Sequence, residues 1–486
     1  MSRSPRFLLA ALAATMLADC TVGPNFQRPT APSDAGYLSP VERTASHGPG
    51  PVAVIAEGPS TRWWTALGSP SLDMLVDQAL ARNASLEASN ATLAAAREQI
   101  AAARGRELPQ VDATGRVERE QVNLAAFGFT NSAALGTSGN PEFNLYSIGG
   151  GVSYDLDLFG GNRRRVEQAA ARAETQLRQT QAAHLTIAGQ VVNQVLLIAA
   201  VRARIATAEA LLAEDQRNVE LTQKRRSAGE GTLVEVLNAQ SQFQNDRGDI
   251  PQLGQQLAEA RHLLATLTGV SPADLGRTDF DLDRLVLPAQ VPVTLPSGLV
   301  HKRPDILQAE AQLNVATANV GIATAELYPD ITLGATVTQG APNIGDIVGS
   351  AFRGFDLFGG LSAPIFHGGT LKAERRAAVE EARAADATYR QTVLDAFRQV
   401  ADLLQAVDND TRSVSNQQEA VSVAQRSLAL SRRSFQVGNS GILQVLESER
   451  LYQRAASNLV EARARQFLNV GRLYVATAGG WTGHPS

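Results

Sequence analysis

The chain carries the same order of sequence features twice, and this doubling limits its possible folds more than any other feature. The segment 229–237 (GEGTLVEVL) matches 438–446 (GNSGILQVL), and 159–161 (FGG) matches 366–369 (FHGG) with a one-residue adjustment. Chance similarity between Ala-rich helical segments would not place Gly-rich turns and Pro breaks in the same order. We therefore expect two structural repeats built on one plan.

Each expected repeat contains a short helix, two strands and a long helical hairpin, over residues 71–270 and 302–480. A Pro-rich connector separates the repeats at 271–301. Residues 20–70 are rich in Pro, Gly and Ser and lack periodicity, so they indicate an ordered or semi-ordered N-terminal arm rather than a domain. Residues 481–486 form a short tail.

The longest helices are expected at about Asn162–Ser227 and Leu371–Gln436, where Pro is absent and apolar residues recur at helical spacing. A helix of roughly 65 residues is close to 100 Å long at about 1.5 Å per residue. Globular helices average about 11–12 residues, so these segments predict coiled-coil-like rods. The other expected helices are two returns ending near Leu267 and Ala478 and two shorter helices at about 72–104 and 304–326.

Both rods end in basic residues followed by Gly, at Gly229 and Gly438. Cations suit a helix C-terminus, and Gly suits the left-handed cap that ends it. Thr232 and Glu235 have the spacing of a capping box for a returning helix. Each repeat is therefore predicted to end in a tight helical hairpin.

Four segments alternate apolar and polar residues with period two, which is the pattern of strands with one apolar face. Tilted strands of about 10 residues suit the wall of an outer-membrane barrel. The segments are 111–118, 146–158, 331–338 and 355–365.

A soluble half-buried hairpin is the alternative reading of these strands. Long polar loops at 128–141 and 340–350, as on an outer surface, argue against it. Four strands cannot close a barrel, and open edges are not tolerated in lipid, so several chains must contribute strands. Two chains would give eight strands with a filled interior, whereas three would give twelve and leave a lumen. We expect the trimer.

The N-terminus has the features of a signal peptide over residues 1–19. Arg3 and Arg6 precede the apolar run 7–16, which is too short to span a bilayer. Cys20, the only Cys, follows directly. No later segment has the length of a transmembrane helix, so any membrane crossing must use strands.

The residues around Cys20 resemble a bacterial lipobox, in which the Cys becomes the first mature residue and carries lipid. Leu17 and Ala18 fit this pattern, but Asp19 occupies a position that usually holds Gly, Ala or Ser. We expect lipidation at Cys20. The alternative is an ordinary signal peptide with an incidental Cys.

Composition excludes several functional classes. The net charge is −4 without a basic block, which argues against nucleic-acid binding. One Cys and six scattered His offer no disulfide and no metal-ligand spacing. No phosphate-binding or dinucleotide motif is complete, since the glycines at 149–151 lie inside a strand pattern. We expect no enzymatic activity and no cofactor.

Three stretches carry a resemblance to a known family. They are the mature start 20–29 (CTVGPNFQRP), the pair Trp63-Trp64, and 295–299 (LPSGL) with 303–306 (RPDI). In this order they resemble TolC/OprM-type outer-membrane efflux lipoproteins of the NodT branch, over essentially the whole mature chain.

The resemblance implies a fold and partners. It implies a homotrimer with one twelve-stranded barrel continued by a helical tunnel, lipid-anchored in the bacterial outer membrane and extending into the periplasm. Such channels are passive: an inner-membrane pump of the RND type supplies energy, and a periplasmic adaptor (a membrane fusion protein) joins pump to channel.

The resemblance also implies that the tunnel closes, and the adaptor docks, at the hairpin tips near 227–236 and 435–445. Acidic residues line this narrow end in the family, and Glu235 and Glu447 match those positions, while Gln444 stands where some relatives carry Asp. Capping is the alternative role for Glu235, and a solvated helix position is the alternative for Glu447. The full set of expected tip residues is Gly229, Thr232, Glu235, Phe435, Gly438, Gln444 and Glu447.

Phe435 stands where relatives use an aromatic to link neighbouring helices, although packing within one hairpin would explain it equally well.

Three functions are compatible with the sequence. The first is export of small molecules or drugs. The second is a protein or metal-ion exporter of the same fold, weakly disfavoured for metal by only three Met. The third is a structural coiled-coil lipoprotein without a barrel.

Overall fold

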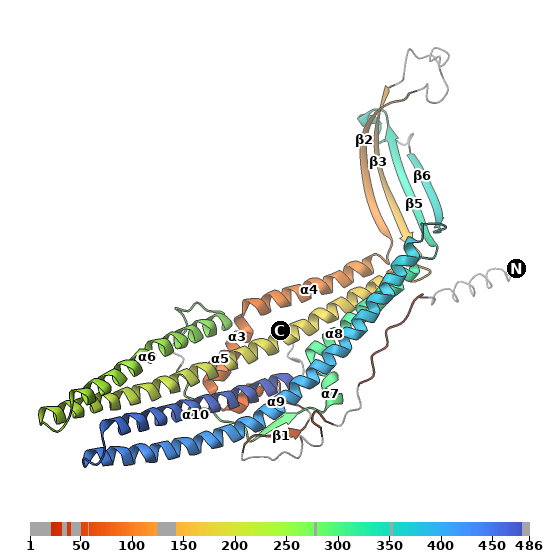
Figure 1. Cartoon of the computed structure of the whole chain (residues 1–486). Helices are drawn as coiled ribbons and strands as arrows, with labels where there is room; N and C mark the ends of the chain where they lie inside the picture. Colours follow the sequence, from red (N-terminus) through yellow and green to blue (C-terminus); the bar gives the residue numbers. More distant parts are fainter. Residues whose placement is uncertain are drawn as a thin grey trace, which may run out of the picture. The chain divides into compact units, whose positions relative to one another are not determined.

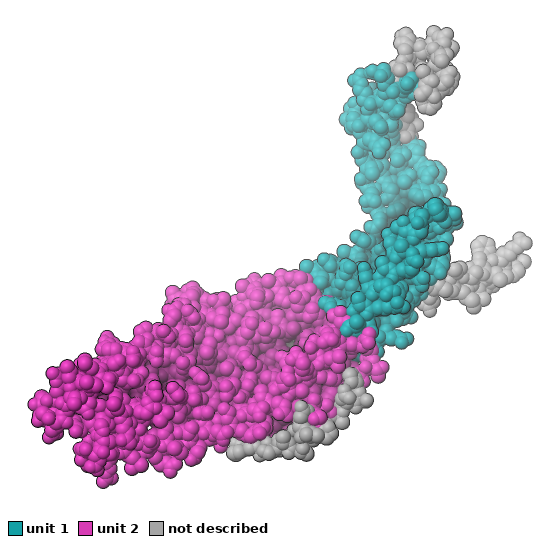
Figure 2. Space-filling view, in the orientation of Figure 1, with its two compact units in different colours: residues 1–28, 94–174, 311–387 teal, residues 29–93, 175–310, 388–486 magenta. Residues whose placement is uncertain are grey.

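The computed structural model describes residues 21–31, 36–39, 50–56, 58–123, 142–276, 279–349 and 353–478. The expected signal peptide and Cys20 lie outside these residues. The chain forms two compact units, and each unit contains segments of both halves of the sequence (Figure 2). The first comprises 1–28, 94–174 and 311–387, and the second comprises 29–93, 175–310 and 388–486.

Helices account for most of the described chain (Figure 1). They are η1 (Trp63–Leu67), α3 (Pro70–Arg82), α4 (Ala84–Gly105), α5 (Gly161–Ser227), α6 (Leu233–Leu267), η4 (Leu282–Arg284), α7 (Pro296–Val300), α8 (Pro304–Ala325), η5 (Ile344–Asp346), α9 (Thr370–Gln436) and α10 (Ile442–Thr477). The strands are β1 (Val52–Ile55), β2 (Gln110–Gln121), β3 (Glu142–Asp155), β4 (Gln290–Val293), β5 (Asp330–Ala341) and β6 (Arg353–Ser362).

The two expected rods are present as α5 and α9, each 67 residues long. Both turn back into α6 and α10, so the two helical hairpins predicted from the doubled sequence are confirmed (Figure 1). None of the described helices is long and apolar enough to cross a membrane.

One expected helix is divided. The predicted helix 72–104 ends at Asn83, whose extended backbone separates α3 from α4. Its side chain caps the new start, because Oδ1 accepts hydrogen bonds from the backbone N–H of Ser85 at 3.0 Å and of Leu86 at 3.4 Å. Its Nδ2 donates to the carbonyl of Leu267 at 2.9 Å, which ties the break to the end of α6. Sequence periodicity does not predict this break, because it depends on the contact between Asn83 and Leu267, which are far apart in the chain.

The four expected strands form one antiparallel sheet in the order β2-β3-β5-β6, which leaves one edge of β2 and one edge of β6 open within the chain. The register places apolar residues in rows across the sheet. One row joins Val111, Val152, Ala335 and Leu357. The opposite face is mostly small and polar, with Phe143, Leu145 and Phe358 as exceptions. Its neighbouring row joins Asp112, Gly151, Thr336 and Asp356.

The apolar face of the sheet is exposed in the single chain. Val111, Val117, Phe355 and Leu357 are each at least 74% exposed. A continuous apolar surface of this kind marks a contact with lipid or protein.

The two predicted loops have different outcomes. The loop 128–141 lies outside the described residues. In the 340–350 region, β5 runs to Ala341 and the short helix η5 follows.

The core of the second unit is built around Trp63 and Trp64, which are 2% and 1% exposed. Trp63 stacks on Tyr474 of α10 with ring centroids 5.5 Å apart. The N-terminal arm also contributes β1, which pairs in parallel with β4 of the connector from Val52↔Gln290 to Ile55↔Val293. Sequence analysis predicted neither of these short strands.

Candidate functional site at the hairpin tips

The two hairpins turn with the same backbone geometry. Gly229 has φ 81° and Gly438 has φ 78°, in the left-handed region that favours glycine. After Gly229, the N–H of Glu230 donates to Arg225 O at 2.8 Å, and after Gly438 the N–H of Asn439 donates to Ser434 O at 2.9 Å. The glycine N–H groups also donate, from Gly229 to Arg226 O at 3.0 Å and from Gly438 to Phe435 O at 3.1 Å. The two bonds at each tip together form a Schellman motif. Both glycines were predicted as caps.

The starts of the returning helices differ. The Thr232 hydroxyl accepts a hydrogen bond from the N–H of Glu235 at 3.3 Å, and the Glu235 carboxylate accepts one from the N–H of Thr232 at 2.9 Å. The predicted capping box is therefore present, and the Glu235 carboxylate serves it. At the other tip Gly441 is the N-cap and supplies no side-chain cap.

Phe435 links the two hairpins within one chain. Its side chain is 3% exposed and packs with Leu428, Ile442, Val445 and Leu446, apolar residues of α9 and α10. The guanidinium of Arg225 on α5 lies 4.6 Å from the centroid of the Phe435 ring.

Arg225 makes a second contact with the same residue. Its Nη1 donates to the carbonyl of Phe435 at 3.1 Å. Phe435 therefore packs within its own hairpin and also holds a cation of the neighbouring one, while its role at a channel tip remains a prediction.

The remaining expected tip residues lie on the surface of α10. Gln444 is exposed, and Glu447 is exposed with its carboxylate 2.7 Å from the guanidinium of Arg450. An exposed ion pair of this kind contributes about 0–1 kcal/mol, so it does not fix the carboxylate in one place. The role of Glu447 in a pore remains a prediction.

Large apolar side chains are exposed at both tips. Leu233, Val234 and Leu237 on α6 are 49%, 64% and 53% exposed, and Val437 and Leu443 at the other tip are 63% and 60% exposed. Exposed apolar side chains gathered at one place on a surface are typical of contact sites.

A buried polar cluster on the tipward part of the same four helices was not predicted. Asp215 of α5, Asp246 of α6 and Glu449 of α10 are 1%, 8% and 2% exposed. Glu449 accepts hydrogen bonds from Asn218 Nδ2 at 2.6 Å and from Arg432 Nη2 at 2.8 Å.

Arg432 of α9 is also 3.0 Å from Glu214 of α5. Burial and the neighbouring carboxylate of Asp246 raise the pKa of Asp215 to about 8. The cluster thus joins both hairpins through the buried carboxyl group of Glu449, which contacts Asn218 of α5 and Arg432 of α9.

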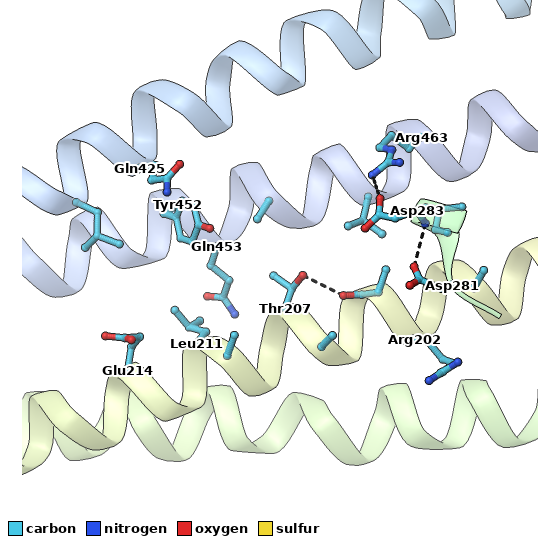
Figure 3. A pocket seen from close by; sticks show the side chains of 18 of the residues that line it. Arg202, Thr207, Leu211, Glu214, Asp281, Asp283, Gln425, Tyr452, Gln453 and Arg463 are labelled. Atoms are coloured by element: carbon cyan, nitrogen blue, oxygen red, sulfur yellow. Dashed lines mark hydrogen bonds and ion pairs between the residues drawn. The ribbon is translucent and has the colours of Figure 1, made fainter. Parts of the chain in front are cut away.

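A cavity of about 830 Å³ lies between α5, α9, α10 and residues 280–283 (Figure 3). Glu214 and Leu211 enter it from α5, and Gln453 points toward them from α10. Arg463 closes one side through its ion pair with Asp283 at 2.5 Å. Arg432 also lines this cavity, so solvent space reaches the edge of the buried cluster.

The segment that follows Cys20 has a docking site on the first unit. Arg164 of α5, only 3% exposed, donates to the carbonyl of Val22 at 3.2 Å and to Asn25 Oδ1 at 2.8 Å. Gly23 lies so close to α8 that a Cβ there would be 2.6 Å from the Cα of Gly321. These contacts fix the segment that begins one residue after Cys20.

Within the part of the chain that the structure describes, no group of three or more His, Cys, Asp or Glu could hold a metal ion. The architecture consists of two helical hairpins and a sheet with one apolar face. The model of the family "Outer membrane efflux protein" matches residues 75–270 and 295–479, one match per repeat. The chain belongs to this family.

Curated relatives resemble it over almost their whole length. The pyoverdine export outer membrane protein OpmQ of Pseudomonas aeruginosa is 33% identical over 93% of each chain. The probable efflux pump outer membrane protein TtgC of Pseudomonas putida is 30% identical over 98% of this chain and 95% of its own. The nodulation protein T of Rhizobium leguminosarum bv. viciae is 27% identical over 98% of this chain.

Solved channels share the fold. The outer-membrane channel OprN superposes with a TM-score of 0.84 at 25% identity, covering 95% of this chain and all of that one. The MtrE channel of Neisseria gonorrhoeae, solved in its open state, gives a TM-score of 0.77 at 25% identity. The protein is thus an outer-membrane efflux channel that extends into the periplasm, and its family is not one of enzymes.

Proposed function

We propose that this chain is one subunit of a homotrimeric, passive export channel that conducts small organic molecules from an inner-membrane pump and a periplasmic adaptor to the cell exterior. The observation that carries the proposal is the four-stranded sheet with one exposed apolar face and two open edges, in a chain of the efflux family.

The number and direction of the strands support the barrel. Because the four strands alternate in direction, β6 of one chain meets β2 of the next in antiparallel orientation. Three chains give twelve strands without an edge, as lipid requires. The apolar row with Val111 and Leu357 then faces lipid, and the row with Asp112 and Thr336 faces the lumen.

The tips support the partner assignment. The exposed apolar residues Leu233, Val234 and Leu443 offer a surface for the helical hairpin of a membrane fusion protein. The exposed carboxylate of Glu447, repeated by symmetry, would give the lumen an acidic ring at this end. An RND-type pump would complete the assembly.

Lipidation of Cys20 belongs to the same proposal. The segment that follows Cys20 is held by Arg164 beside the start of α5, which directly follows the sheet in the chain. A lipid on Cys20 would therefore lie near the level of the membrane strands. Mass spectrometry of the mature N-terminus tests this, and an unmodified Cys20 would refute it.

The cargo class is proposed from the names of the relatives, which refer to pyoverdine, toluene and antibiotics. The test is expression in a strain that lacks its own efflux channels, together with a matching pump and adaptor. Restored export of a fluorescent siderophore or dye is expected, and purified trimers should conduct ions in planar bilayers.

Absence of export together with the absence of any conductance would overturn the channel proposal. Export of a metal ion or protein substrate without export of any organic compound would favour the alternative cargo of the same fold. The structural coiled-coil lipoprotein is opposed by the family assignment.

A further inference from the structure

The carboxyl group of Asp215 occupies an unusual environment. The residue is 1% exposed, and neither of its side-chain oxygens receives a hydrogen bond from any donor among the described residues. An ionised carboxylate in such a place would carry a large desolvation cost. The ionisable neighbour that affects it most is not a cation but the carboxyl group of Asp246.

Two carboxyl groups within hydrogen-bonding contact need one proton between them, because two like charges at that distance cannot both be maintained away from water. Asp246 is itself 8% exposed, and its Oδ2 already accepts a hydrogen bond from Gln242 Nε2 at 2.7 Å. The free oxygens of Asp215 therefore point to a missing proton rather than to a missing side-chain donor.

The charged groups on all four packed helices favour a proton held between Asp215 and Asp246. Asp215 and Glu214 come from α5, Asp246 from α6, Glu449 from α10 and Arg432 from α9. Two of the four carboxyl groups contact the guanidinium of Arg432, which is 2.8 Å from Glu449 and 3.0 Å from Glu214. Its charge lowers the pKa of Asp215 by less than burial and the neighbouring carboxyl groups raise it.

We propose that Asp215 and Asp246 form a buried proton-binding site that, when occupied, holds α6 against α5 and keeps the first hairpin docked on the second. The docking runs through Asn218, which stands one turn from Asp215 and donates to Glu449 at 2.6 Å. Loss of the proton places a second uncompensated negative charge beside this contact and loosens it.

The direction of the pH effect follows from linkage. Burial raises the pKa of Asp215 to about 8 in the folded protein, whereas an exposed aspartate titrates near about 4. The folded protein therefore holds a proton that the unfolded chain releases between these values. Its stability falls as the pH rises from about 4 to about 8 and changes no further above that range.

If the chain forms the channel proposed above, the same proton should affect its conductance. Splaying the hairpins would hydrate Asp215 and lower its pKa, so the packed hairpins bind the proton more tightly than splayed ones. Conductance of the purified trimer should be low below about pH 7 and rise through about pH 8. Asp215→Asn, which copies the protonated group, should remove this rise.

The direct test does not need channel activity. Infrared difference spectra of the detergent-solubilised full-length protein should show a carboxylic-acid carbonyl band that disappears as the pH rises through about 8. The band should be lost in Asp215→Asn and changed in Asp246→Asn. It should persist in Asp249→Asn, the matched control, because Asp249 is an exposed residue of the same helix α6.

Hydrogen–deuterium exchange provides the second readout. After correction for the intrinsic pH dependence of exchange, α6 peptides around Asp246 should exchange faster above about pH 8 in the wild type but not in Asp215→Asn. A carbonyl band unaffected by both Asn variants, or exchange independent of pH in the wild type, overturns the proposal. Absence of conductance at every pH would instead count against the channel function, while the two spectroscopic tests still decide the proton site.

Discussion

At the scale of single residues, the two tip glycines have measurable consequences. Gly229 and Gly438 both have positive φ, and neither would meet a neighbouring atom within 4 Å if a Cβ were added. Replacing either by Ala should therefore cost about 1 kcal/mol through backbone conformation alone. Gly248→Ala is the control: this glycine lies inside α6 with the same open surroundings and should gain about 0.5–1 kcal/mol. Denaturation monitored by helical circular dichroism should give opposite signs, and equal signs would contradict the assignment.

Arg432 provides a second prediction at this scale. Arg432→Gln removes the guanidinium that pairs with the buried Glu449 and should destabilise the protein by about 1.5–3 kcal/mol, because Asn218 still donates to Glu449 and the Arg432 side chain is itself 32% exposed. Arg426→Gln removes a cation of the same helix whose ion pair with Glu419 spans 3.9 Å on the surface, and it should cost less than about 1 kcal/mol. Chemical denaturation of the two variants checks the difference. Similar losses would mean that the buried cluster does not join the hairpins.

At the scale of elements, the two hairpins should respond differently to changes at their helix starts. Thr232→Ala removes the capping box and should destabilise the first hairpin by about 1 kcal/mol. At the second tip, Gly441→Ser adds the side-chain acceptor that this N-cap lacks and should stabilise the second hairpin by a few tenths of a kcal/mol. Local hydrogen exchange at the start of α6 and of α10 measures each effect separately. Equal increases at both starts would refute the difference.

The same difference leads to a functional prediction. Exchanging the tip sequence Glu230-Gly231-Thr232 with Asn439-Ser440-Gly441 moves the capping box to the other hairpin. Because gate opening and adaptor docking would depend on unequal hairpins, each single replacement should reduce export in the reconstituted system. Full export from both replacements would show that the tips are interchangeable.

At the scale of the whole molecule, the open edges of β2 and β6 predict the assembly. Cysteines introduced along these strands, on a Cys20→Ser background, should form disulfides between chains and not within one chain, because β3 and β5 lie between the two edges. Non-reducing electrophoresis should show a ladder that ends at the trimer. A ladder that ends at a dimer would favour the eight-stranded alternative.

Periodicity alone predicted the helices and strands that are long and regular. The rods α5 and α9, the hairpin glycines and the capping box follow from local rules, since their signals are spacing, turn residues and caps that act within a few positions. The division of the first helix at Asn83 and the β1–β4 pair depend on contacts between residues far apart in sequence, and no local signal marks them.

The buried cluster has a signal in the sequence, because its aspartates stand at positions of the helices that are otherwise apolar. Buried positions in α6 recur every seven residues, and Asp246 stands in that row between apolar members. Asp215 likewise stands four residues from both Leu211 and Val219 on the buried side of α5. A charged residue in an apolar row is a candidate buried site. The row is Ala239, Asp246, Leu253, Ala260 and Leu267.

The amino-acid sequence by itself determined the doubled plan, the lengths of the helices, the alternation of the strands and the family, because these properties are local or repeated along the chain. Only the tertiary structure decided which charges meet. Whether an aspartate is solvated or shares a proton depends on the helices packed around it, and these come from both halves of the chain. Desolvation is a property of the packed arrangement, so the state of Asp215 is set by Asp246, Glu449 and Arg432 rather than by its own neighbours in sequence.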